Sequence, residues 1–162
     1  ELKVNGRSLG RKECPKYGYL EWDAVYRPGY VEAIGWKNGV RVARERIETT
    51  GEAVKANAKM EQSVDIIVAN VDLMDAEGRL VPDACDTVSV AIDPSLQLLG
   101  WGNGDPAMRD PDHPEPVSES GSGLSVRIGE ASADNASIYR LPAFNGHFQM
   151  ILRPITRKYE RK

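Results

Sequence analysis

The sequence predicts an all-β protein. Short runs in which apolar and polar residues alternate recur along the chain, and glycine, proline, asparagine or aspartate separates one run from the next. The 3.6-residue spacing of apolar positions that indicates an amphipathic helix is almost absent. A hydrophobic content of 41% over 162 residues is enough for a packed core.

The first fifty residues contain a series of predicted strands. The first alternating run ends at Asn5-Gly6, a pair that favours the tight turn of a β-hairpin. In Leu20–Ala24 the apolar residues alternate with two acids, which predicts a strand with Trp22 on its core side. A second asparagine-glycine pair, Asn38-Gly39, predicts another hairpin within residues 31–42.

These strands suffice for only part of a domain. Residues 1–51 hold fewer predicted strands than the roughly seven of an immunoglobulin-like sandwich. We therefore expect the C-terminal part of a small β-sandwich domain there. The pattern restarts at Glu52, and we expect residues 52–162 to form an immunoglobulin-like β-sandwich domain. The sequence thus predicts two immunoglobulin-like β-sandwich modules, the first truncated, in a chain cut from a longer protein.

The second module has one irregular run. In Val64–Met74 the apolar positions change parity after Val68, which predicts a long strand with a bulge or a fully buried centre. The other expected strands show regular alternation, and they lie in residues 54–59, 88–92, 96–101, 124–128 and 148–152.

Two segments are predicted to turn the chain sharply. In Leu99–Pro106, three glycines that can adopt positive φ alternate with an aromatic and an amide residue, and a proline closes the segment. In Arg140–Gly146, Asn145-Gly146 is predicted to form the turn into the last strand. Between them, Pro106–Gly123 is rich in proline, serine and acidic residues, and we expect a loop with too little apolar surface to fold.

Composition argues against several classes of protein. The net charge of -3 and the shortness of the basic stretch 153–162, expected to be solvated, argue against nucleic-acid binding. No run approaches the ~20 apolar residues that cross a membrane, and residues 1–4 lack the pattern of a secretory signal. Cys14 and Cys85 have no cysteine or histidine at metal-ligand spacing, so they predict no metal site. An oxidising compartment would allow a disulfide between them, but we favour free thiols. No cofactor is predicted.

The sequence predicts no catalytic centre in this chain. Hydrolysis of a glycoside normally needs two carboxyl groups that face one another. The acids of the first module occupy strand positions expected to face solvent, namely Glu21, Asp23, Glu32 and Glu45. Ser122 lacks the strand-to-helix context of a nucleophile elbow, and the glycines of residues 100–104 lead into a loop instead of the helix of a dinucleotide-binding fingerprint.

Two segments contain residues of the kinds that form local binding sites. Acidic residues of a loop can bind Ca²⁺, and the densest set of candidate ligands here is Asp105, Asp110, Asp112, His113 and Glu115. Their spacing matches no known calcium-binding loop. We therefore favour a solvated acidic loop and predict no metal site. Trp101 lies in the glycine-rich turn, where an exposed aromatic ring would stack on a sugar. The candidate carbohydrate-binding residues are Trp101, Asn103, Asp105, His113 and Glu115. His147 is expected at the surface, because it alternates with Phe148.

Several motifs resemble one enzyme family, the bacterial family 2 glycoside hydrolases, which include β-galactosidase-like enzymes. The first module resembles the end of the small β-domain that follows the catalytic barrel, through Val4–Gly10, Tyr26–Ala33 and Gly35–Gly39. The second resembles the next, C-terminal immunoglobulin-like domain, through Val71–Pro82, Gly102–Pro106 and Ala143–Gly146. Two features depart from the family: Trp101 replaces a small aliphatic residue, and Glu119–Tyr139 is longer than usual.

The resemblance implies that the catalytic glutamates lie in an upstream barrel and that no catalytic residue lies in this chain. It also implies that this barrel is the chain's partner and that the parent enzyme is periplasmic or secreted. The leading hypothesis is a non-catalytic fragment that supports or orients the barrel. One alternative is a carbohydrate-binding module that holds an oligosaccharide at Trp101, Asp105 and the acidic loop. Another is a bacterial surface or adhesion module whose edge strands recruit a protein.

Overall fold

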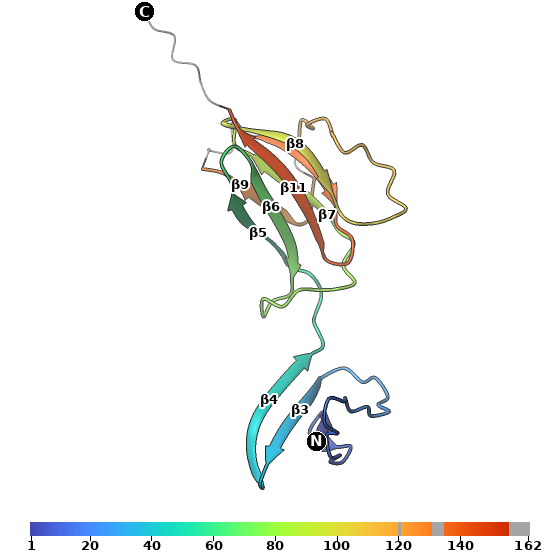
Figure 1. Cartoon of the computed structure of the whole chain (residues 1–162). Coiled ribbons are helices and arrows are strands. Elements are labelled where there is room, and N and C mark those ends of the chain that lie inside the picture. Colours follow the sequence, from blue (N-terminus) through green and yellow to red (C-terminus); the bar gives the residue numbers. More distant parts are fainter. Residues whose placement is uncertain (120, 131–134, 156–162) are drawn as a thin grey trace, which may run out of the picture. The chain divides into compact units, whose positions relative to one another are not determined.

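The computed structural model describes residues 1–119, 121–130 and 135–155 (Figure 1). Within these ranges the chain forms β-strands and no α-helix, which confirms the all-β class. The chain divides into two compact units, Glu1–Thr49 (unit 1) and Thr50–Lys162 (unit 2). No helix in the described part of the chain is long and apolar enough to cross a membrane. The predicted basic tail lies, beyond Ile155, outside the described residues.

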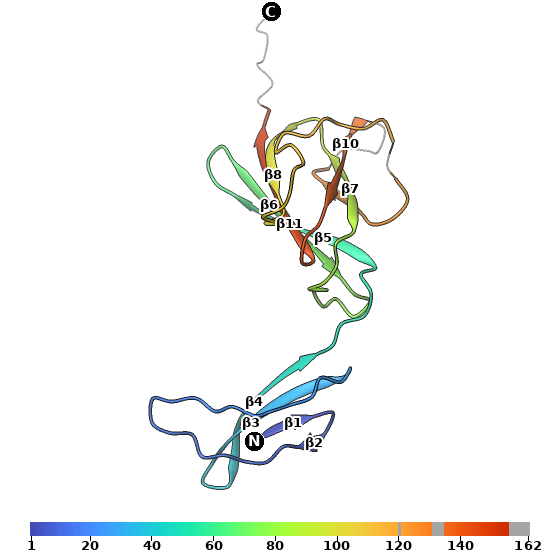
Figure 2. The same cartoon turned by 90° about the vertical axis from the view of Figure 1, so that its right-hand side faces the viewer.

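Unit 1 is one four-stranded antiparallel sheet (Figure 2). The strand order is β2-β1-β3-β4, and the bounds are β1 (Leu2–Val4), β2 (Arg7–Ser8), β3 (Tyr30–Lys37) and β4 (Val40–Glu48). Both predicted asparagine-glycine hairpins are present. Asn5 and Gly6 have φ of 49° and 81°, and Asn38 and Gly39 have 50° and 77°, as the type I′ turn requires.

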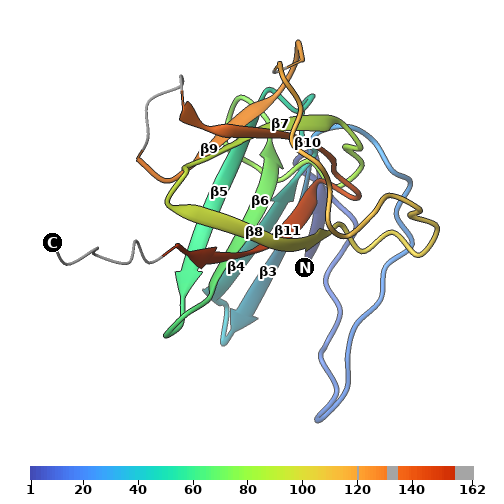
Figure 3. The ribbon, with the colours of Figure 1, turned by 90° about the horizontal axis from the view of Figure 1, so that it is seen from above.

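The strand predicted over Leu20–Ala24 does not form. The connection between β2 and β3 contains no strand, and Figure 3 shows its blue ribbon as a long loop. Trp22 is half-buried, whereas Ala24 is exposed. The alternating pattern is therefore present in the sequence without a neighbouring strand for it to join.

Unit 2 is a sandwich of two sheets (Figure 3). One sheet has the order β5-β6-β11-β8, with β5 (Lys55–Gln62), β6 (Ile67–Met74), β8 (Leu96–Gly102) and β11 (His147–Pro154). The other has the order β10-β7-β9, with β7 (Thr87–Ile92), β9 (Ser125–Ile128) and β10 (Ser137–Pro142). All pairs are antiparallel except β7 with β9, which is parallel.

The core of unit 2 lies between these two sheets. Every second residue of β6, β11 and β7 points into it and is almost fully buried, which gives the rows Ala69, Val71, Leu73; Phe148, Met150, Leu152; and Val88, Val90, Ile92. The period of two along each strand accounts for these rows. Ile128 of β9 and Leu141 of β10 complete the same core.

The change of parity in Val64–Met74 marks a hairpin, so the prediction of one long strand there is wrong. Chain reversal occurs between β5 and β6, where the Ser63 N–H donates to the Ile66 carbonyl at 2.8 Å. Val64 is 89% exposed because it lies in this turn. The inward-facing set begins only within β6, which starts at Ile67.

The two predicted glycine-rich turns differ from one another. Gly100 and Gly102 belong to strand β8, and within Leu99–Pro106 only Gly104 has positive φ, 81°. Asn145 and Gly146 form the predicted turn, with φ of 51° and 81°. A Cβ atom at Gly146 would lie 2.2 Å from the Val81 carbonyl oxygen, so this position excludes any side chain.

We predict that Phe148→Ala destabilises unit 2 by about 3–5 kcal/mol, because it leaves a cavity between the two sheets. Urea unfolding followed by circular dichroism measures the change. The control is His147→Ala on the same strand, whose side chain is exposed and whose loss is expected to change the free energy of unfolding by less than about 0.5 kcal/mol. Equal effects of the two substitutions would contradict the assigned core.

Candidate functional site

Trp101, the centre of the predicted carbohydrate site, lies in the core of unit 2. It is 7% exposed, and its ring meets that of Phe148 edge to face, with centroids 6.3 Å apart and planes at 87°. The indole Nε1–H donates to the Pro111 carbonyl at 2.9 Å. Neither the face nor the polar edge of this ring is presented to solvent, so stacking on a sugar would require Trp101 to leave its packing.

Asn103 and Asp105 hold the turn after β8. Asn103 is 5% exposed; its Nδ2 donates to the Pro142 carbonyl at 3.1 Å, and its Oδ1 accepts from the Asp105 N–H at 3.0 Å. The Asp105 carboxylate in turn accepts from the Ala107 N–H at 2.8 Å. These are the bonds that short polar side chains make in turns. They connect the end of β8 to the end of β10.

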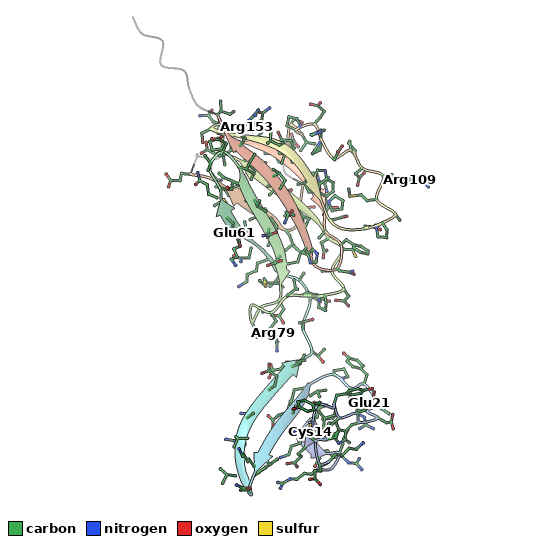
Figure 4. All side chains as sticks on the ribbon, in the orientation of Figure 1. Cys14, Glu21, Glu61, Arg79, Arg109 and Arg153 are labelled. Atoms are coloured by element: carbon green, nitrogen blue, oxygen red, sulfur yellow. The ribbon has the colours of Figure 1, made fainter. Side chains whose placement is uncertain are left out.

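His113 and Glu115 are exposed on the acidic connection between β8 and β9, whose Arg109 extends into solvent in Figure 4. As expected of a loop, this connection contains no strand among its described residues, and backbone hydrogen bonds attach it to the sandwich. The Trp101 N–H donates to the Asp112 carbonyl at 3.1 Å, and the Val117 N–H donates to the Ile138 carbonyl at 2.7 Å. In the described ranges, no group of three or more His, Cys, Asp or Glu residues is arranged to hold a metal ion.

The predicted carbohydrate-binding residues therefore do not converge on one open surface. Trp101, Asn103 and Asp105 make internal bonds, whereas His113 and Glu115 are exposed on the connection. The pKa of the Tyr139 hydroxyl is raised, mainly by burial and to a smaller extent by the negative charge of Glu115. A binding role for these residues stays a prediction.

The sequence reasoning missed Asp75, the best-connected polar side chain of unit 2. It is fully buried, and its Oδ1 accepts from the backbone N–H groups of Glu77 at 3.1 Å and Arg79 at 2.8 Å. Its Oδ2 accepts from the Gly51 N–H at 3.1 Å and from the Arg79 Nε–H at 2.9 Å. The sequence offers one signal for this role: Asp75 is the first residue of the turn 75–78, and an aspartate at that position commonly accepts hydrogen bonds from the backbone that follows.

These bonds determine the charge of Asp75. Burial alone would raise the pKa of its carboxyl group, but the N–H groups of Arg79 and Gly51 and the Arg79 guanidinium outweigh burial and lower the pKa to about 2. The carboxylate is consequently ionised at neutral pH. It serves as a fixed acceptor that ties Gly51 to the turn after β6, and it is a poor proton donor.

Glu32 corrects the expectation that the acids of the first module face solvent. This β3 residue is 8% exposed, and its Oε1 accepts from the Arg44 Nε–H at 2.7 Å. Within the described ranges the buried acids are Glu32 and Asp75, and each is paired with an arginine of its own unit. Two facing carboxyl groups, one of them kept protonated, are the arrangement that glycoside hydrolysis uses, and neither acid has that environment.

The remaining candidates are at the surface. Cys14 and Cys85 are free and exposed, and Figure 4 shows Cys14 and Glu21 on unit 1. His147 is exposed, as its alternation with Phe148 predicts.

The strand order of unit 2 and its two-sheet core define an all-β protein of the immunoglobulin-like sandwich class. Comparisons with known proteins narrow this class. Residues 1–43 match the family described as Domain of unknown function (DUF4982). A β-galactosidase of Bacteroides ovatus, BoGH2A, is 30% identical over 114 residues, which are 65% of this chain and 13% of that protein.

Solved structures agree in fold. A glycosyl hydrolase family 2 member from Bacteroides cellulosilyticus has a TM-score of 0.68 at 18% identity, over 97% of this chain and 19% of its own. A β-glycosidase from Bacteroides vulgatus has a TM-score of 0.60 at 23% identity, over 94% and 17%. The chain thus spans less than a fifth of each of these relatives. It is similar to a segment of family 2 glycoside hydrolases, which confirms the resemblance predicted from its motifs.

We predict that Asp75 makes the stability of unit 2 depend on acid pH. The pKa of this group is 3.8 in an unfolded chain and about 2 in the fold, so its stabilisation is complete above about pH 4 and is lost as the pH falls toward 2. Asp75→Asn should lower the Tm at pH 7 and flatten the loss of Tm between pH 4 and 2. The control is Asp83→Asn, an exposed acid. An unchanged acid profile in Asp75→Asn would contradict this account.

We also predict that titration of the chain with galactosides leaves the Trp101 fluorescence unchanged, because the ring is buried against Phe148. A Trp22→Phe, Trp36→Phe double variant isolates the Trp101 signal. Trp101→Ala should instead destabilise unit 2 by about 3–5 kcal/mol. A saturable change with sugar in the double variant would show that the site predicted from the sequence exists.

Proposed function

We propose that this chain is a non-catalytic C-terminal β-sandwich segment of a bacterial family 2 glycoside hydrolase of the β-galactosidase type, and that it supports or orients the catalytic barrel of the parent enzyme. The observation that carries the proposal is the match of nearly the whole chain to a small part of much longer family 2 enzymes. More than four fifths of the length of these enzymes lies outside the matched part, which leaves room there for a catalytic barrel.

The polar chemistry of the described residues supports a structural role. Asp75 bonds to backbone N–H groups and to the Arg79 guanidinium, Asn103 bonds to backbone groups, and Glu32 binds Arg44. Groups satisfied in this way stabilise turns and edges, and they are unavailable to a substrate. In the proposal the parent enzyme hydrolyses a β-linked sugar with retention, using two carboxyl groups of the barrel, in the periplasm or outside the cell.

The carbohydrate-binding alternative has weaker support, because its central ring is buried and its other residues serve the turn after β8. The alternative of a surface module that recruits a protein through edge strands rests on the β-sandwich fold alone.

The proposal predicts that the purified 162-residue chain does not hydrolyse a chromogenic β-galactoside, whereas the parent enzyme does. Deleting residues 50–162 from the parent should lower its Tm and its kcat while leaving the barrel folded, as judged by the circular dichroism of the remaining protein. Hydrolysis by the isolated chain would overturn the non-catalytic role. A deletion that changes neither Tm nor kcat would overturn the supporting role.

A further inference from the structure

Asparagine followed by glycine occurs four times in the chain, always within the described residues. The pairs are Asn5-Gly6, Asn38-Gly39, Asn103-Gly104 and Asn145-Gly146. In such a pair the backbone nitrogen of the glycine can attack the side-chain amide carbon of the asparagine, because glycine has no Cβ atom to shield that nitrogen. The reaction requires a side-chain amide that can rotate and a glycine N–H that is free of hydrogen bonds. The four pairs differ in both respects.

The fold holds the side-chain amides of Asn5 and Asn103. The Asn5 Nδ2 donates to the Pro28 carbonyl at 3.0 Å, and its Oδ1 accepts from the Tyr30 N–H at 2.7 Å. The Asn103 side chain is buried, and both its amide atoms bond to backbone groups. Each side chain must therefore lose two hydrogen bonds before its carbonyl carbon can approach the next nitrogen, and each loss has a cost in free energy.

At Asn145 the fold occupies the attacking nitrogen instead. The Gly146 N–H donates to the Ala84 carbonyl at 2.8 Å, and Gly146 is buried. The close approach of Val81 to Gly146, described above, also leaves this backbone no room to rotate.

Asn38-Gly39, at the end of the β3–β4 hairpin, has none of these restraints (Figure 1). Both residues are exposed, and a Cβ atom built on Gly39 would have no neighbouring atom within 4 Å. Among the described residues, neither the Asn38 side-chain amide nor the Gly39 N–H makes a hydrogen bond. The two reacting groups are thus both free.

The β3–β4 ladder next to this turn is short. Two cross-strand pairs separate the turn from an interruption of the register, namely Trp36↔Arg41 and Lys37↔Val40. At the interruption Val42 is left without a partner in β3, and such a bulge disrupts the ladder locally. Val40 is 64% exposed, so little packing opposes the opening of the turn. Exposed segments with few buried contacts open at low cost in free energy.

We propose that Asn38-Gly39 is a site of spontaneous deamidation and that the fold confines this modification to one of the four pairs. The Gly39 nitrogen loses its proton and bonds to the Asn38 Cγ, the Cγ–Nδ2 bond breaks, and ammonia leaves with that proton. Water then opens the resulting succinimide ring, which gives aspartate or isoaspartate at position 38. The reaction consumes water and no other reactant.

The modification alters the hairpin in two ways. Either product adds a negative charge at the turn. Isoaspartate also lengthens the main chain by one carbon atom, because the backbone then runs through the former side chain. Since the geometry of a two-residue turn sets the register of the strands that it joins, the isoaspartate form loosens the end of the β3–β4 hairpin.

Peptide mapping by mass spectrometry tests the proposal on the 162-residue chain stored at mildly alkaline pH. The mass change from NH₂ to OH measures deamidation at each pair, and protein isoaspartyl methyltransferase labels the isoaspartate. In the folded chain Asn38 should react at least about tenfold faster than Asn5, Asn103 and Asn145, because hydrogen bonds restrain those three pairs. In urea all four should react at similar rates, since glycine follows each asparagine.

Two variants test the assignment to this residue. Asn38→Ser should remove the isoaspartate label from the folded chain. The matched control is Asn57→Ser, which replaces an exposed asparagine that precedes alanine and should leave the label unchanged.

Similar rates at the four pairs in the folded chain would overturn the proposal, and so would a faster reaction at Asn5, Asn103 or Asn145. An Asn38 that reacts in urea and is protected in the folded chain would contradict it as well, because the turn would then be closed. None of these measurements depends on glycosidase activity, so their outcome is separate from that of the proposed function.

Discussion

A sheet with one apolar face is stable in water only when another layer covers that face, and this constraint organises both units. Unit 2 meets it within its own sequence, because β6 and β11 in one sheet face β7 in the other across a buried core. Unit 1 forms one sheet in which Ile34 is buried, whereas Val31 and Ile47 are exposed. The hydrophobic effect acts on both units in the same way. The units differ because unit 2 has enough strands for two sheets, whereas unit 1 has one sheet.

Polar residues in this chain act mainly on its own backbone. Asp75 replaces four hydrogen bonds to water with bonds to Gly51, Glu77 and Arg79, and Asn103 joins the turn after β8 to Pro142. Such bonds matter because an unpaired buried polar group costs about 1–3 kcal/mol. Buried acids that are paired in this way make the fold rigid, which is compatible with the proposed supporting role.

Local signals predicted the turns and strands well, and long-range pairing is where sequence reasoning failed. Asn5-Gly6, Asn38-Gly39 and Asn145-Gly146 were predicted because the turn itself demands positive φ at both residues. The alternation in Leu20–Ala24 predicts a strand, but whether one forms depends on a partner strand that the pattern does not contain. Strand β10 was missed because Pro142 suggested a corner, although the proline occupies the last position of the strand. The glycines beside Trp101 predict an exposed turn. The ring is instead buried against Phe148, and the local sequence does not reveal this contact because the two residues are far apart in the chain.

Strand β11 lies between β6 and β8 and follows both of them in the sequence. During synthesis on the ribosome, β6 and β8 therefore emerge long before the strand that joins them. Until β11 leaves the exit tunnel, two strand edges and an apolar surface stay unpaired, the condition that favours aggregation and chaperone binding. The sandwich thus closes only after His147–Pro154 has been synthesised, so a nascent chain interrupted before Phe148 has no route to the folded state of unit 2.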